Sequence, residues 1–205
     1  LGLLWEDIER AVARIETDRS SLIAHFMGAI VINQVKTFGA QVQAFEVIDG
    51  QQRLTTFQLL LAALRDVALE HGSPYAQEIA KYLLNDGVME RPEEERYKLW
   101  PSITDRRAFV SLIDPSADLS GIAGLAEGDE LVGKLATVAH SSFRARIVRH
   151  VTVNGAYDET RLQVLFEALK DGLAVVSIEL EGGDDPQTIF ETLNSRGVAL
   201  SPADL

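Results

Sequence analysis

Five consecutive polar residues at positions 49–53 carry the clearest chemistry in this chain: Asp, Gly, Gln, Gln and Arg. They follow a short, largely apolar run that predicts a buried strand, and they precede a long amphipathic pattern that predicts a helix. A strand that enters a helix through a glycine turn directs free backbone N–H groups and the positive end of the helix dipole at one point. Phosphate binds at such points, and Arg53 in the first helical turn adds a guanidinium there.

The same residues also allow a simpler interpretation. Asp49 and Gln52, three residues apart, resemble a capping box, which stabilises a helix start and needs no ligand. A cap uses neither a second glutamine nor an arginine, so the motif has more polar groups than capping requires. The two interpretations are compatible, because Asp49 can cap the helix while its neighbours bind phosphate in a cleft that Arg53 faces.

A second motif, Ile-Phe-Glu-Thr-Leu-Asn-Ser-Arg-Gly, occupies positions 189–197. Together with Asp-Gly-Gln-Gln-Arg-Leu-Thr-Thr at positions 49–56, it resembles the N-terminal domain of GmrSD-type modification-dependent restriction enzymes, a domain of the ParB/sulfiredoxin-like superfamily. The resemblance covers nearly the whole chain. It implies a nucleotide-binding NTPase domain that uses a nucleoside triphosphate with Mg²⁺ and gates DNA cleavage by a separate nuclease domain in bacterial anti-phage defence.

The resemblance assigns roles to residues of both motifs. The nucleotide-binding residues that it implies are Gly50, Gln51, Arg53, Thr55, Asn194 and Arg196. Phosphoryl transfer also needs an oriented water and charge neutralisation, so Asp49 is expected to bind the metal or orient the water, Gln52 to position the nucleophile, and Arg53 to act in catalysis. A simpler interpretation of the second motif is that Asn194 and Arg196 end a helix, with Gly197 in the C′ position.

Two other functions remain open. A nuclease active site in this domain would need clustered carboxylates around metal ions, but the first motif offers only Asp49, with Glu46 one strand step away on a different part of the pleat. A domain that only recognises modified DNA or a protein partner, without catalysis, needs neither clustered carboxylates nor metal ions. The nuclease ranks below the nucleotide hypothesis because its carboxylates are not clustered. The formal net charge of −12 argues against autonomous DNA binding by a recognition domain, but not against a role that depends on a partner.

Composition limits the partners. The chain has 205 residues, 31 acidic against 19 basic side chains, and a formal net charge of −12. Broad DNA binding depends on Lys and Arg neutralising phosphates, so we expect contact with DNA to come through other domains of a longer protein. The sequence shows no membrane span, no signal peptide and no cysteine, which favours a cytoplasmic protein. Homo-oligomerisation is compatible with these features.

The order of patterns predicts an α+β domain with a small mixed sheet and a large helical portion. We expect one domain over residues 1–205, with a helical insertion at about 71–170, truncated at both ends relative to the family. Helices are predicted at 3–15, 20–26, 54–70, 75–84, 105–113, 131–151, 158–170 and 185–193, and strands at 29–35, 42–48 and 173–180. The first two strands are expected to form an antiparallel hairpin, and 91–96 and 114–128 to be loops.

Overall fold

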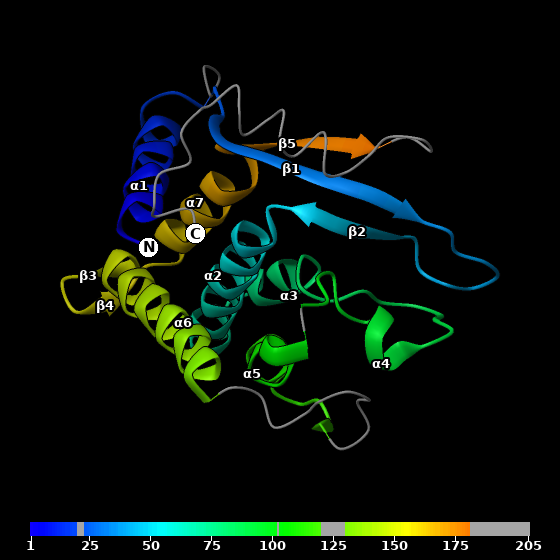
Figure 1. The fold of residues 1–205 in the computed structure, drawn as a ribbon. Coiled ribbons are helices and arrows are strands. Elements are labelled where there is room, and N and C mark those ends of the chain that lie inside the picture. The colour runs from blue at the N-terminus through cyan, green and yellow to red at the C-terminus, as the bar shows by residue number, and fades with distance from the viewer. Residues whose placement is uncertain (20–22, 102, 120–129, 181–205) are drawn as a thin grey trace.

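A computed structural model of the protein describes residues 1–19, 23–101, 103–119 and 130–180 (Figure 1). The predicted α+β class is confirmed, because a small mixed sheet lies beside a larger helical part. Within these residues, every helix is too short or too polar to cross a lipid bilayer.

The sheet has three strands in the order β2-β1-β5. Strand β1 (His25–Val35) pairs antiparallel with β2 (Ala44–Asp49), as predicted, and parallel with β5 (Leu173–Leu180). Val31 of the central strand lies opposite Asp49 on one side and Ile178 on the other, and it is 1% exposed. The last residue of β2, Asp49, is therefore paired with the middle of the central strand β1. The first motif begins at this residue.

Two irregularities interrupt β1. Opposite β5, the register shifts between Phe26 and Ala29, and Gly28 within that bulge has φ +103°. Opposite β2, the register shifts between Val31 and Ile32, because their partners are Asp49 and Val47. The second shift leaves one extra residue of β2, Ile48, directly before the motif.

Helix α2 (Gln51–Glu70) leaves the end of β2 and runs into the helical part of the molecule (Figure 1). Its middle is buried on almost every side, from Leu59 to Ala68. The main core joins it to four other helices: α1 (Gly2–Thr17), α3 (Tyr75–Ala80), α6 (Glu130–Val151) and α7 (Glu159–Asp171). Because α2 packs against these helices over the middle of its length, its first turn is held in a fixed position relative to the sheet.

A second apolar cluster lies on another side of α2. It joins Leu59 and Ala62 to Leu83, Tyr97 and the helix α5 (Ile103–Ile113). Between Leu83 and Tyr97 the chain forms an excursion closed by an isolated bridge of Leu84 with Tyr97, and the short helix α4 (Pro92–Glu95) lies within it. This excursion returns the chain to the neighbourhood of β2.

Several predicted boundaries are wrong for identifiable reasons. The predicted helix at 20–26 lies partly outside the described residues, but His25 and Phe26 belong to β1. Gly28, which was expected to end that helix, instead lies in a bulge of the strand. The helix predicted at 75–84 ends at Ala80, since Leu84 instead bridges Tyr97. The loop predicted at 91–96 contains a helical turn, with Pro92 in its first position.

A two-stranded ribbon was not predicted at all. Strands β3 (Thr152–Val153) and β4 (Ala156–Tyr157) pair across Asn154 and Gly155, which have φ of 52° and 80°. Two consecutive positive φ values are the requirement of a type I′ hairpin turn, which Asn-Gly satisfies best. The helix predicted at 185–193 lies outside the described residues.

Candidate functional site: a groove at the start of α2

The turn between β2 and α2 is built on Gly50. This residue is the N-cap of α2 and has a left-handed backbone, with φ 95° and ψ 12°. A Cβ at this position would lie 2.6 Å from Cγ2 of Ile30, so a larger residue is excluded by both conformation and space. Strand β2 ends at Asp49, one residue later than predicted, and α2 begins at Gln51, three residues earlier than predicted.

The predicted cap at Asp49 is wrong. Asp49 precedes the N-cap residue, and no side chain of the described residues caps α2. The first intrahelical bond runs from the N–H of Leu54 to the carbonyl of Gly50, at 3.1 Å. The N–H groups of the first helical turn therefore receive no side-chain cap, and the dipole of a 20-residue helix ends there.

Arg53 lies in the first turn of α2, as predicted, and its side chain reaches back to β1. Nη1 donates a hydrogen bond to the carbonyl of Ala29 at 2.5 Å. The guanidinium lies against Gly28, where an added Cβ would come within 2.9 Å of Cζ and Nη2. Arg53 thus connects α2 to the bulge of β1 across 24 residues of sequence.

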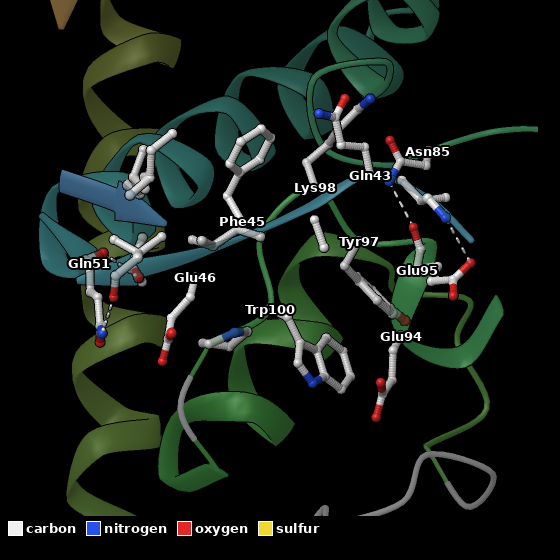
Figure 2. A pocket seen from close by; sticks show the side chains of 18 of the residues that line it. Gln43, Phe45, Glu46, Gln51, Asn85, Glu94, Glu95, Tyr97, Lys98 and Trp100 are labelled. Carbon is white, nitrogen blue, oxygen red and sulfur yellow. Dashed lines mark hydrogen bonds between the residues drawn. The ribbon is translucent and has the colours of Figure 1, made fainter. Parts of the chain in front are cut away.

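A groove of about 850 Å³ opens beside this turn, between β2, the start of α2 and the excursion that contains α4 (Figure 2). Of the first motif, Gln51, Gln52 and Thr55 line it, whereas Asp49, Gly50 and Arg53 are absent from its lining. The structure therefore separates the predicted site residues into two sets. One set borders the groove, and the other forms the turn and its contact with β1.

The groove-lining residues of α2 are differently engaged. The Gln51 amide donates to the carbonyl of Val47 at 2.9 Å, and the Thr55 hydroxyl donates to the carbonyl of Gln51 at 2.9 Å. Gln52 is exposed, and its side chain forms no hydrogen bond with another described residue. No described residue occupies the Gln52 amide, which can both donate to and accept from a ligand.

The opposite wall is organised by Glu95 of α4. Its Oε2 accepts hydrogen bonds from the N–H of Val42, at 3.3 Å, and from the N–H of Glu90, at 3.1 Å. The side chain is 8% exposed, and Oε1 lies 3.7 Å from Nε of Arg91. Nη1 of Arg91 also pairs with Glu94 at 3.1 Å. Glu95 thus ties the excursion to the chain just before β2 and holds one arginine beside it.

The rest of that wall is the segment from Tyr97 to Pro101. Tyr97 is 6% exposed, and its ring centroid lies 5.2 Å from that of Trp100. The guanidinium of Arg106 covers Trp100 at 4.6 Å from the ring centroid. Burial, followed by the charge of Asp114, raises the pKa of Tyr97, so this phenol stays neutral. Tyr97 and Trp100 therefore form a packed part of the wall.

Sequence reasoning missed most of this groove. Its apolar lining includes Phe45, which is 39% exposed, and its charged lining includes Glu46, Glu94, Glu95, Arg91 and Lys98. Among the described residues, no group of three or more His, Asp and Glu side chains is arranged to hold a metal ion. Asn194 and Arg196 lie outside the described residues, and their predicted approach to Arg53 stays a prediction.

Comparison with known families gives one whole-chain match. Residues 1–205 match the family described as GmrSD restriction endonuclease, N-terminal domain. No curated protein matches the chain.

Proposed function

Given that this chain belongs to the family of GmrSD restriction endonuclease N-terminal domains, we propose that it binds a nucleoside triphosphate at the start of α2 and hydrolyses it. The family description makes this domain part of a restriction endonuclease. In the proposed role, nucleotide hydrolysis gates DNA cleavage by a separate nuclease domain, and DNA is contacted through other parts of the full-length protein.

One observation carries the proposal: the uncapped first turn of α2 borders a groove of about 850 Å³. Free N–H groups and the helix dipole favour an anion at that end of the groove. Phe45, Gln43 and Gln52 line it as well and offer an apolar face and amide groups. Ligand sites of this size combine apolar walls with a small number of polar groups that set orientation.

The proposal gives the residues of the motif distinct tasks. Gln51, Gln52 and Thr55 face the ligand, and the amide of Gln52 orients the attacking water. Gly50 shapes the turn, because Ile30 leaves no space for a side chain there. Arg53 has donors beyond the one that Ala29 accepts, and a guanidinium carries five N–H donors in total. In this proposal those donors serve the phosphates, together with Asn194 and Arg196.

The proposed cofactor is Mg²⁺ bound together with the triphosphate. Such ions need one or two protein carboxylates when substrate phosphates supply the other ligands, and Asp49 is the carboxylate of the motif. The ion would neutralise phosphate charge during hydrolysis. This requirement is compatible with a chain whose described residues offer no preformed cluster of metal ligands.

The test uses the full-length protein and the four ribonucleoside triphosphates with Mg²⁺. Binding is measured by calorimetry and hydrolysis by phosphate release. Gln52→Ala should slow hydrolysis roughly 10²-fold with little change in melting temperature, because it removes the group that orients the water. Gln77→Ala is the matched control, since Gln77 is exposed on α3 and does not line the groove. The proposal is wrong if the wild-type protein neither binds nor hydrolyses any of the four.

A further inference from the structure

We infer that Lys98 is the cation that binds the phosphates of the nucleotide in the groove, an inference that rests on the proposed function. Sequence reasoning assigned this charge to Arg53. The structure places Arg53 against β1, where it donates to Ala29, and outside the lining of the groove. A cation that binds the phosphates from the opposite wall of the groove, in addition to Arg53, must therefore come from another residue.

The groove needs a positively charged side chain if it is to bind a triphosphate. Its lining contains three carboxylates, those of Glu46, Glu94 and Glu95. A triphosphate brings several further negative charges, and the start of a helix offsets the equivalent of about half an elementary charge. Without a positive side chain on the opposite wall, the groove would repel the ligand.

Two cations line the groove, Arg91 and Lys98. Arg91 is engaged on its own helix, with contacts of 3.1 Å to Glu94 and 3.7 Å to Glu95. Lys98 is exposed and forms no salt bridge with any residue that the structure describes. Lys98 is consequently the groove cation whose charge is available to a ligand.

The position of Lys98 is fixed by its backbone. Its N–H donates to the carbonyl of Leu83 at 3.1 Å, and the preceding residue, Tyr97, bridges Leu84. The ring of Tyr97 belongs to the second apolar cluster and is 6% exposed, whereas the neighbouring Lys98 is exposed. In Figure 2 the side chains of Lys98 and Phe45 extend to one side of β2 and that of Glu46 to the other.

The experiment compares Lys98→Met with two matched variants in the full-length protein. Lys36→Met makes the same charge change at an exposed lysine outside the groove, and Lys98→Arg keeps the charge at the site. The probes are the ribonucleoside triphosphate that the wild-type protein binds best and inorganic tripolyphosphate, which shares its phosphates but has no base or ribose. Dissociation constants are measured by calorimetry at two salt concentrations.

Lys98→Met should weaken both probes about ten- to a hundredfold, because a charge-assisted contact to phosphate is lost, and should reduce the salt dependence of binding. Lys36→Met and Lys98→Arg should bind within about threefold of the wild type. Unchanged affinity of Lys98→Met, or weakening for the nucleoside triphosphate alone, overturns the inference and leaves the proposed function intact. A wild-type protein that binds no nucleotide overturns the proposed function, and with it this inference.

Discussion

The guanidinium of Arg53 lies on the backbone of Gly28, at a distance that would bring an added Cβ within 2.9 Å of Cζ. Gly28 forms part of the bulge in β1, and the carbonyl of the next residue, Ala29, accepts the Arg53 hydrogen bond. The side chain of Arg53 in α2 therefore occupies the space that the absent side chain of Gly28 leaves in β1. This contact gives Arg53 a role in stability whatever ligand it also serves.

Arg53→Ala is the first prediction. The variant should lower the free energy of unfolding by about 1–3 kcal/mol, because it removes a hydrogen bond from a charged donor to the partly buried Ala29 carbonyl. This differs from the expectation for an arginine that merely faces a cleft. Urea denaturation of the wild type and the variant provides the measurement.

A double-mutant cycle with Gly28→Ala tests the contact itself. Gly28→Ala should also destabilise the fold, since φ +103° is strained for alanine and its Cβ meets Arg53. When Arg53 is already replaced by alanine, the Cβ of Gly28→Ala no longer meets its side chain, and the steric part of the destabilisation disappears. The losses in free energy of unfolding of the two single variants should therefore not add in the double variant. Strict additivity would show that the arginine and the glycine are not in contact.

A second prediction compares two aspartates at helix starts. Asp158 caps α7, its Oδ1 accepting from the N–H of Thr160 at 2.9 Å and of Arg161 at 3.3 Å. Asp158→Ala should therefore lower the free energy of unfolding by about 1 kcal/mol. Asp49→Ala should cost clearly less, because Asp49 does not cap α2. Equal losses in urea denaturation would restore the capping role of Asp49.

The third prediction concerns acid sensitivity. Burial, followed by the charge of Arg161, lowers the pKa of His150, while Glu16 and Glu9 act in the opposite direction; its Nε2 has no hydrogen-bond partner among the described residues. The unfolded chain takes up this proton near the ordinary pKa of about 6.5, and the folded chain resists it. Stability should therefore fall as the pH decreases from about 6.5 toward the lowered pKa.

His150→Gln removes that titration. Denaturation at a series of pH values between about 5 and 7.5 should show a smaller loss of stability in the variant than in the wild type. Burial alone would raise the pKa of Asp66, but hydrogen bonds from His140 and Arg65 outweigh it and hold the pKa below its usual value. The contribution of Asp66 to the free energy of unfolding is therefore lost at lower pH than that of His150. An identical pH profile for both proteins would contradict the role of His150.

Local patterns predicted the elements whose burial is periodic. The apolar stripes of α1, α2 and α7 and the β-branched run of β5 each gave an element of the right type. The errors lie at residues that are compatible with two different local structures. Gly28 was interpreted as the end of a helix at 20–26, yet its left-handed backbone forms a bulge within β1. The Asn154-Gly155 turn was a usable hairpin signal between the helices predicted at 131–151 and 158–170, and it was not used.

The candidate site was predictable in its first half only. The glycine turn and the helix start follow from neighbouring residues, so the sequence located them. Lys98 and Glu95 reach the groove through the bridge of Leu84 with Tyr97 and the hydrogen bond from Val42, which join positions far apart in sequence. No local pattern encodes such contacts. The orientation of Arg53 toward Ala29 likewise depends on how α2 lies against β1.

Strand β2 lies at one edge of the sheet, and side chains occupy backbone groups at both of its ends. Glu95 accepts the N–H of Val42 just before the strand, and Gln51 donates to the carbonyl of Val47 near its end. An exposed strand edge is a template on which other chains add strands and aggregate. Here a foreign strand would have to displace both side chains before it could pair along β2. The contacts that shape the groove therefore also hinder the addition of a strand at the two ends of β2.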